Sequence, residues 1–252
     1  MTESNRTQQQ KQFKILLIGD NCTDVYQYGN VDRISPEAPV PVFKFSHEER
    51  LRGMAGNVYN NLLALGCNVY SVYGETSTKT RLIDIRSKQQ IVRIDNDVIS
   101  APATINYNLD NYDAIVVSDY NKGTVSYELI EQLIETKIPV FVDTKKTDLG
   151  RFQGAWVKIN ELEYSKIKSE CSGLIVTRGP KGADAIHHQY SSKAPKVEVV
   201  DVTGAGDTFL AALTYNYLHT KNITRAMDFA NQAAAVTVQH VGCYAPTLEE
   251  IL

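Results

Sequence analysis

The sequence predicts an α/β protein with a doubly wound, mainly parallel sheet that is flanked by helices and carries a small β lid. Short apolar runs alternate with segments of helical spacing along most of the chain. Most of the apolar runs stop at a polar residue or a glycine, which is typical of parallel strands whose carboxyl ends bind a ligand. Two alternating segments, near 38–46 and 81–95, interrupt this pattern and are the candidate lid strands.

Length and composition limit the possible classes of protein. The 252 residues are enough for a single α/β domain over residues 13–252, after a polar, Gln-rich tail at 1–12 that we expect to be disordered. The formal net charge of −3 gives no electrostatic case for binding nucleic acid or an anionic membrane. Without a signal peptide, a membrane-length apolar window or paired cysteines, the sequence predicts a cytoplasmic protein.

The first half of the chain supplies a strand, a helix and the lid. Phe13–Asp20 is an apolar run ending in Gly-Asp, which predicts a buried strand followed by a functional turn. Ala38–Phe45 alternates and contains two prolines, so it predicts an edge or lid strand. A helix is expected over Asn57–Gly66, a strand over Asn68–Gly74, and two short strands around a polar turn at 86–89.

The second half repeats the strand and helix alternation. The run Asp113–Tyr120 predicts a strand, Ser126–Thr136 an amphipathic helix, and Pro139–Lys145 a strand with an acidic end. The segments GAWVKIN and GLIVTRG each predict a strand followed by a polar turn. Beyond Thr208 two helices are expected, TFLAALTYNYLHT and TRAMDFANQAAAVTVQHV.

The stretch VDVTGAGDTF places three small residues and a carboxylate at the start of the first of these helices. A helix N-terminus has unpaired N–H groups and the positive end of the dipole, so Gly204, Ala205 and Gly206 can form an anion hole. Asp207 would then accept the proton of an attacking hydroxyl. The structural alternative is a glycine-rich turn in which Asp207 only caps the helix. The chain has no GxxxxGK[ST] motif, and Phe209 replaces the third glycine of a dinucleotide motif.

Several motifs together identify a family. DVTGAGDTF closely resembles the signature of the ribokinase, or phosphofructokinase-B, family of sugar kinases. ILLIGDNCTDVYQYGNVDRISPEAPVPVFKF, RSKQQIVRID, VVSDYNKG and VDTKKTDLGRFQGA are similar to the heptose-phosphate kinase domain of the bifunctional protein of ADP-heptose synthesis. The resemblance runs in order from Ile15 to the C-terminus. It implies a ribokinase-like fold and a kinase that phosphorylates a substrate similar to heptose 7-phosphate at its anomeric hydroxyl.

The resemblance also implies a catalytic and nucleotide site. Asp207 corresponds to the catalytic base, and the preceding Gly-Ala-Gly to the anion hole. Asn160 and Glu163 match an NxxE motif that holds Mg2+ through water, although alone they would suggest a helix cap and a surface charge. ATP and Mg2+ are the expected cofactors, and K+ remains open. The residues expected beside the nucleotide, some of which would equally suit a plain turn or close helix packing, are Thr177, Gly179, Gly182, Thr203, Asn231, Ala235 and Val238.

The sugar side is assigned in the same way. Carboxylates at strand ends can accept hydrogen bonds from sugar hydroxyls, and a cation can pair with a phosphate already on the substrate. Each of these charges alone would suit a solvated surface as well. The expected substrate residues are Asp20, Asp24, Gly53, Asn57, Arg86, Asp119 and Lys122. The expected partner is a small sugar or sugar phosphate, and a homodimer through the exposed edges of the lid is a further expectation.

The chain departs from the family at two points. Met54 stands in RGMAGN where the family has a second glycine, and TSTKTRLIDIR follows VYGE where the family has a further helix and strand. These departures leave two alternatives open. One is a catalytically reduced protein that binds nucleotide or sugar in a regulatory role, and the other is a kinase of another small alcohol such as a nucleoside.

Overall fold

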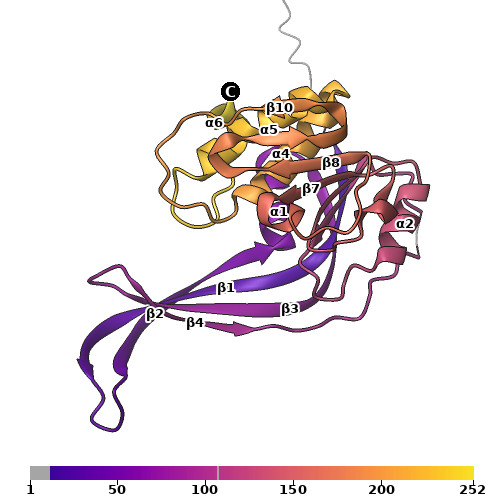
Figure 1. Cartoon of the computed structure of the whole chain (residues 1–252). Coiled ribbons are helices and arrows are strands. Elements are labelled where there is room, and N and C mark those ends of the chain that lie inside the picture. Colours follow the sequence, from indigo (N-terminus) through magenta and orange to yellow (C-terminus); the bar gives the residue numbers. More distant parts are fainter. Residues whose placement is uncertain (1–11, 107) are drawn as a thin grey trace, which may run out of the picture.

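The computed structural model describes residues 12–106 and 108–252 (Figure 1). The tail that we predicted at 1–12 lies outside the described residues except for Gln12. Within the described part, ten strands form one sheet in the order β10-β9-β8-β7-β6-β5-β1-β3-β4, with β2 paired to β1. Neighbouring strands from β3 through β1 to β8 are parallel. The predicted mainly parallel α/β sheet is therefore confirmed.

The described elements have the following bounds. The strands are β1 (Lys14–Ile34), β2 (Pro41–Met54), β3 (Asn68–Asp84), β4 (Gln90–Asn96), β5 (Ala114–Asp119), β6 (Val140–Thr144), β7 (Trp156–Asn160), β8 (Gly173–Thr177), β9 (Ala183–Ala185) and β10 (Tyr190–Ser192). The helices are α1 (Ala55–Ala64), α2 (Tyr127–Glu135), α3 (Glu161–Tyr164), α4 (Ala205–Thr220), α5 (Ile223–Thr237) and α6 (Leu248–Ile251), with short 3-10 turns at Leu149–Phe152, Gly179–Lys181 and Ile186–His188. None of these helices is long and apolar enough to cross a membrane.

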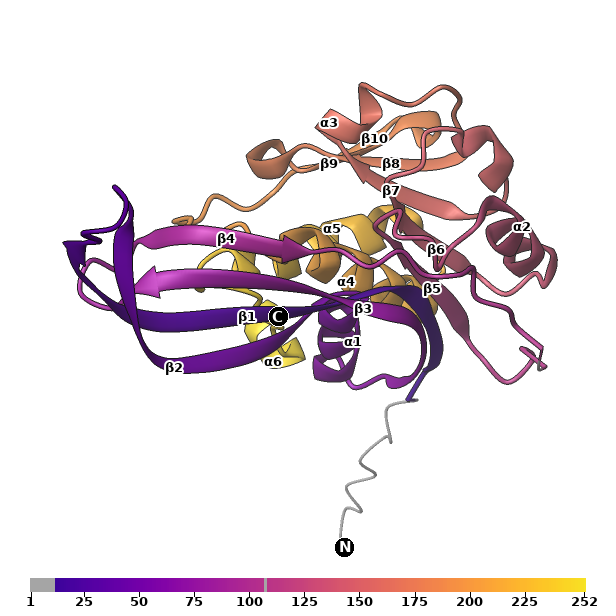
Figure 2. The same cartoon turned by 90° about the horizontal axis from the view of Figure 1, so that it is seen from below.

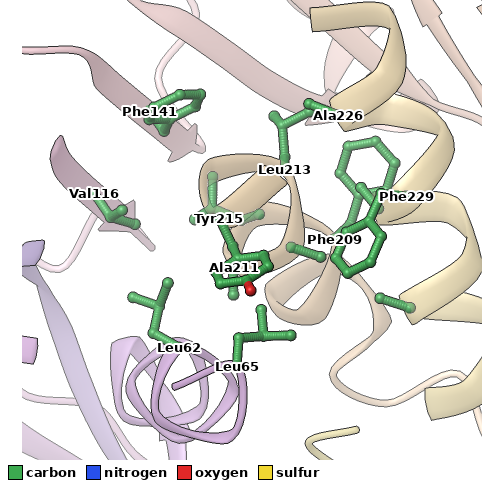
Figure 3. Packing of buried hydrophobic residues seen from close by; sticks show 14 of the residues in the cluster. Leu62, Leu65, Val116, Phe141, Phe209, Ala211, Leu213, Tyr215, Ala226 and Phe229 are labelled. Carbon is green, nitrogen blue, oxygen red and sulfur yellow. The ribbon is translucent and has the colours of Figure 1, made fainter. Parts of the chain in front are cut away.

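Two hydrophobic cores cover the two faces of the sheet. Along β1, Ile15 and Leu17 point into the core that α1, α4 and α5 share, while Leu16 and Ile18 point into the core beneath α2. Strands buried on both faces carry continuous apolar runs, which explains why these runs lack alternation. Figure 3 shows the first core, where side chains of α1 and of α4 and α5 meet those of β5 and β6. The helices thereby fix the position of the N-terminus of α4 relative to the strand ends.

The first strand corrects a prediction. We expected it to end at Asp20, but β1 continues to Ile34 and leaves the body of the protein (Figure 1). Its pairing with β3 shifts register between Gly19 and Asn21, and a bulge of this kind lets a polar residue sit inside a continuous strand. Asp20 is therefore an internal strand residue. The prediction failed because an apolar run that ends does not show whether pairing also ends.

The lid is the outer part of the same sheet, made of β2, β4, residues 21–34 of β1 and residues 76–84 of β3. β2 runs antiparallel to β1, and β4 pairs antiparallel to β3 between Thr78 and Ile83. Figures 1 and 2 show these four strands projecting together from the body. β3 passes from the body into the lid without a break. The lid is thus anchored to the core by two continuous strands, β1 and β3.

Candidate active site

The candidate site lies where four parallel strands end. β5, β6, β7 and β8 stop at one edge of the sheet, and polar residues occupy or directly follow their last positions. Contacts from the ends of β5 and β7 reach the first turn of α4. This is the edge at which open α/β sheets bind their ligands, because the loops diverge there and leave space between strands.

Asp207 is the central carboxylate of this edge. It lies in the first turn of α4 and its side chain is almost fully buried, with 6% of the residue exposed. Asn57 Nδ2 of α1 donates to Asp207 Oδ2 at 2.8 Å, and the Tyr120 hydroxyl donates to Oδ1 at 3.1 Å. Asn61 in turn donates to the backbone and side-chain oxygens of Asn57. The Asn57 amide is therefore held with its N–H group facing the carboxylate.

The surroundings of Asp207 raise the pKa of its carboxyl group toward neutral pH. Burial is the main cause that raises the pKa of Asp207, to about 6; the nearby charge of Asp143 acts in the same direction, and hydrogen bonding by Asn57 and Tyr120 and the charge of Lys158 act against it. Burial removes the carboxylate from water, which disfavours its charged form. This effect is the largest single cause of the raised pKa of Asp207. A carboxylate with this pKa is ionised at neutral pH. Its pKa is also close enough to neutral for it to take up a proton during a reaction, which suits a general base.

The predicted anion hole has the backbone that its glycines require. Gly204 is the N-cap of α4 with φ +79°, and a Cβ on it would lie 2.7 Å from Asn57 Nδ2. A Cβ on Gly206 would lie 2.8 Å from Lys158 Nζ. Side chains at these positions would collide with the polar groups that surround Asp207. The N–H groups at the start of α4 have no partner within the helix, and Ala205 N makes one long hydrogen bond of 3.3 Å to Val202 O outside it.

Lys158 and Asp143 form a buried ion pair below this helix start, which the sequence reasoning missed. Lys158 Nζ lies 2.6 Å from Asp143 Oδ2, and 4% of Lys158 is exposed. Asp143 Oδ1 is buried and makes no hydrogen bond to any described residue. The sequence does show a charged residue near the end of each of these two apolar strands, in VFVDT and WVKIN. This pattern could have indicated that Asp143 and Lys158 are paired. The pair places a cation directly beside Gly206.

Asn160 and Glu163 cap α3 reciprocally. Asn160 Oδ1 accepts a hydrogen bond from Glu163 N, and Glu163 Oε2 accepts one from Asn160 N, both at 2.8 Å. Glu163 Oε1 also pairs with Lys145. Burial opposes the charge on Lys145, but Asp143, Glu163 and Asp207 outweigh it and raise its pKa. The helix-cap alternative is thus realised, and Lys145 connects the cap with the cluster around Asp207.

Asp20 and Asp119 are both buried and bound to protein groups. The Asp20 carboxylate accepts hydrogen bonds from the backbone N–H groups of Tyr120 (2.8 Å), Lys122 (2.9 Å) and Thr124 (3.3 Å). Asp119 accepts from Asn121, Thr144 and Lys146, and burial raises its pKa against the charge of the lysine. Both carboxylates thus shape the loop after β5, and most of their acceptor capacity is used there.

Asp24 and Gly53 meet at the base of the lid. A Cβ on Gly53 would collide with Asp24 Oδ2, so a larger residue at this position would displace the carboxylate. Arg81 Nη1 of β3 lies 2.5 Å from Asp24 Oδ1. Burial raises the pKa of the Cys243 thiol to about 12, with the charges of Asp207 and Asp24 contributing. Because Cys243 also lies against Gly204, Asp24 belongs to the same neighbourhood as the helix start.

Two predicted substrate residues are not brought to this cluster. Lys122 Nζ pairs with Asp97 Oδ2 at 2.5 Å, so its charge is already compensated. Arg86 lies exposed in the turn between β3 and β4, at the end of the lid far from the body. The sequence placed Arg86 correctly in a turn, but it could not show that β3 carries this turn away from the sheet edge.

The predicted nucleotide residues lie around β8, β10 and α5. Thr177 ends β8, Gly179 has φ +55°, and a Cβ on Gly182 would collide with Ser192 O. Asn231 donates to Ser192, which fastens β10 to α5. The remaining three residues lie where α5 ends near the 200–203 loop. Ala235 is buried, and Val238 O accepts hydrogen bonds from Val200 N and Asp201 N. Thr203 donates from its backbone N–H and its hydroxyl to Asp201 Oδ1.

At this sheet edge a glycine-lined helix start meets a buried carboxylate, a combination suited to holding a phosphoryl group beside a base. The model of the pfkB family of carbohydrate kinases matches residues 58–251. The chain therefore belongs to the pfkB family of carbohydrate kinases, which transfer a phosphoryl group to an alcohol. This confirms the family that the sequence motifs indicated.

Curated relatives extend the comparison. The chain is 38% identical to the bifunctional protein HldE of Nitratiruptor sp. over 299 aligned positions, which cover 94% of this chain and 64% of that protein. It is 32% identical to the HldE of Aliarcobacter butzleri, with 96% and 64% covered. The chain thus spans about 64% of the length of these relatives. The 299 positions exceed the 252 residues here, so the relative has segments without a counterpart in this chain.

Solved structures confirm the ribokinase-like fold. The ribokinase of Thermotoga maritima superposes with a TM-score of 0.72 at 18% identity, covering 95% of this chain and 98% of that one. The ribokinase of Arabidopsis thaliana, complexed with ribose and ATP, gives a TM-score of 0.70 at 16% identity, with 96% and 98% covered. The shape of the chain is therefore that of a ribokinase in spite of the shortened segment before the lid.

Proposed function

We propose that this protein is an ATP-dependent kinase that phosphorylates a sugar phosphate similar to heptose 7-phosphate at the anomeric hydroxyl. The observation that carries the proposal is the buried carboxylate of Asp207 at the glycine-lined start of α4, with a pKa of about 6. Membership of a carbohydrate kinase family supports the reaction type. The choice of a heptose phosphate rests on the resemblance of RISPEAPVP and SDYNKG to the heptose-phosphate kinase domain.

The reaction follows from the placement of these groups. Asp207 accepts the proton of the acceptor hydroxyl while the hydroxyl oxygen forms a bond to the γ-phosphorus and the bond to the β-phosphate oxygen breaks, releasing ADP. The amides of Gly204, Ala205 and Gly206 hold the charge of the transferring group, and Lys158 adds a cation beside Gly206. Asn57 and Tyr120 keep the Asp207 carboxylate in position.

Magnesium is proposed to be held through water by Asn160 and Glu163. The described residues contain no group of three His, Cys, Asp or Glu side chains that could enclose a metal ion. Mg2+ keeps several of its waters and uses few protein carboxylates, so a sparse set of donors fits it. The cap of α3 uses Asn160 Oδ1 and Glu163 Oε2 once each, Lys145 pairs with Glu163 Oε1, and each of these oxygens retains a further lone pair. When bound, the ion would neutralise phosphate charge. A dependence on K+ remains part of the proposal to test.

A second candidate function is a binding or regulatory protein with reduced catalysis. Met54 favours it, because this residue holds φ +51° at the start of α1, a backbone conformation that normally requires glycine. The family has a glycine at this position, so the chain has accepted local strain beside its proposed sugar site. Asp207, Asn160 and Glu163 favour the kinase, since a binding protein has no use for the base and metal residues together.

The experiment is a substrate panel with product analysis. Purified protein, ATP and Mg2+ are incubated with heptose 7-phosphate, hexose phosphates, free sugars and nucleosides, and ADP release is followed. Phosphorus NMR of the product then locates the new phosphate group. Turnover with a sugar 7- or 6-phosphate and a new anomeric phosphate supports the proposal. Turnover with a nucleoside favours a kinase of another alcohol, and ATP binding without turnover favours the second candidate.

A further inference from the structure

Tyr120 is fixed at both ends of the residue. It directly follows β5, and its backbone N–H donates to Asp20 Oδ2 at 2.8 Å. Its hydroxyl donates to Asp207 Oδ1 at 3.1 Å, across 87 residues of sequence. The Lys145 ammonium lies 5.3 Å from the centre of its ring, within the range of a cation–π contact. The ring is thus held between the loop after β5, the end of β6 and the start of α4.

The hydroxyl can act only as a donor toward Asp207. Burial raises the pKa of Tyr120 well above its ordinary value, and the negative charge of Asp207 raises it further. The phenol therefore stays protonated throughout the range in which Asp207 titrates. A hydrogen bond donated to a carboxylate stabilises the ionised form over the protonated form.

We propose that Tyr120 is a positioning residue that orients the Asp207 carboxylate and favours its ionised form. Asn57 holds one carboxylate oxygen and Tyr120 holds the other, so the plane of the group is fixed by two donors from different elements. Each oxygen keeps a lone pair for an acceptor hydroxyl. The catalytic consequence rests on the proposed function, whereas the effect on the carboxylate itself does not.

Other charged and titratable groups also face Asp207, and all of them remain when only the Tyr120 hydroxyl is removed. They come from β6, β7 and the segment after α5, and they are Asp143, Lys145, Lys158 and Cys243. Asn57 of α1 completes the surroundings. Replacing Tyr120 by phenylalanine keeps the ring and its contact with Lys145, so the change isolates one hydrogen bond.

The direct test is the titration of Asp207 in the full chain without ligands. Carbon-13 NMR of aspartate-labelled protein follows the side-chain carboxyls with pH, and Asp207→Asn identifies the signal. We expect the Asp207 midpoint to move to higher pH in Tyr120→Phe. Tyr190→Phe is the matched control, because its hydroxyl donates to another carboxylate, that of Asp228, at 2.8 Å. An Asp207 midpoint that is the same in wild type and Tyr120→Phe overturns the proposal.

The kinetic test adds the consequence for catalysis. For the acceptor sugar, kcat/KM of Tyr120→Phe is expected to fall about tenfold to a hundredfold near neutral pH, the effect of losing a hydrogen bond to a charged group. The acid limb of the pH profile should move to higher pH, while ATP binding stays unchanged. A loss of equal size at every pH would indicate a merely structural role and contradict the proposal.

The two tests separate this proposal from the proposed function. A shifted Asp207 midpoint in a protein that phosphorylates none of the panel leaves the Tyr120 contact established and rejects the kinase. Normal kinase turnover with an unshifted Asp207 midpoint supports the kinase and rejects the role of Tyr120.

Discussion

Asp207 combines a functional property with a cost in stability. In the unfolded chain an aspartate ionises near pH 3.9, whereas burial holds the pKa of Asp207 at about 6 in the folded protein. Between these two values the folded state binds more protons than the unfolded state. Stability therefore falls as pH rises through this window, and above it the full penalty of about 2–3 kcal/mol remains. This is the trade-off expected of a buried catalytic carboxylate.

We predict that Asp207→Asn is more stable than the wild type at pH 8, by about 1–3 kcal/mol or several degrees in Tm. The gain should shrink on acidification and disappear near pH 4, where the wild-type carboxyl is neutral in the folded protein. Thermal unfolding across this pH range measures it. Asp110→Asn, at an exposed position, should show no such gain. An Asp207→Asn variant that is less stable than wild type at pH 8 would contradict the account of burial.

At the residue scale the sequence predicted groups within one motif better than groups from different elements. Gly204, Ala205, Gly206 and Asp207 are neighbours in the chain, so their joint position at a helix start follows from local rules. Tyr120 and Lys158 reach the same point from two different strands. Their side chains are brought there by the pairing order of the sheet, which no local pattern encodes. This is why the sequence pattern singled out Asp207 but not Tyr120 or Lys158.

At the scale of elements, the short helix α3 separates two possible roles of one carboxylate. Glu163 closes the capping box with Asn160, and it is also the proposed outer ligand of Mg2+. Glutamine serves a capping box as glutamate does, but it has no charge.

We therefore predict that Glu163→Gln unfolds within about 1 kcal/mol of wild type while its turnover requires a higher Mg2+ concentration. Magnesium titrations of the initial rate, together with thermal unfolding, measure both quantities. Glu161→Gln is the matched control on the same helix, since Glu161 pairs with Arg178 at the surface. Equal Mg2+ dependence in wild type and Glu163→Gln would show that Glu163 caps the helix and takes no part in metal binding.

The spacing of apolar residues predicted those strands and helices whose pattern is contained within a few neighbouring residues. The alternation of apolar strands with amphipathic helices predicted the parallel sheet and its flanking helices. It did not reveal that β1 and β3 each continue into the lid, because β1 passes through Asp20 at a bulge and β3 through the polar stretch after Gly74. A change from apolar to polar residues marks where a strand leaves the core, and pairing can continue beyond that point.

At the scale of the whole molecule, the lid exposes apolar side chains on one face. Val92 and Ile94 of β4 are 44% and 54% exposed, and they lie opposite Leu82 and Thr80 of β3. Paired residues share a face of the sheet, so this face is the reverse of the one that carries Arg81. The sequence led us to expect a homodimer through the exposed edges of the lid, and we propose that such a dimer also packs on this face and covers these side chains.

Wild-type protein is accordingly expected to behave as a dimer in solution, and Ile94→Lys as a monomer or as a dimer weakened by roughly tenfold or more, because a charge would be buried at the interface. Sedimentation or light scattering across concentrations measures this. Leu63→Lys, at an exposed apolar position on α1, is the control for adding a charge elsewhere. A wild-type protein that stays monomeric at high concentration would remove the dimer from the account.

The whole chain also shows how far a resemblance reaches. Motifs from Ile15 to the C-terminus predicted the family and the fold, and both were confirmed. They did not predict how the chain would accommodate the shortened segment before the lid. The structure accommodates it by leading β3 directly from the core into the lid.

The most direct test of Asp207 as the base is kcat/KM for the best sugar phosphate, from ADP release with saturating ATP and Mg2+, as a function of pH in wild type and Asp207→Asn. We expect the wild-type kcat/KM to rise with pH around a midpoint near 6, and the variant to be slower by several orders of magnitude without that rise. A variant that turns over at nearly the wild-type rate would show that Asp207 is not the base.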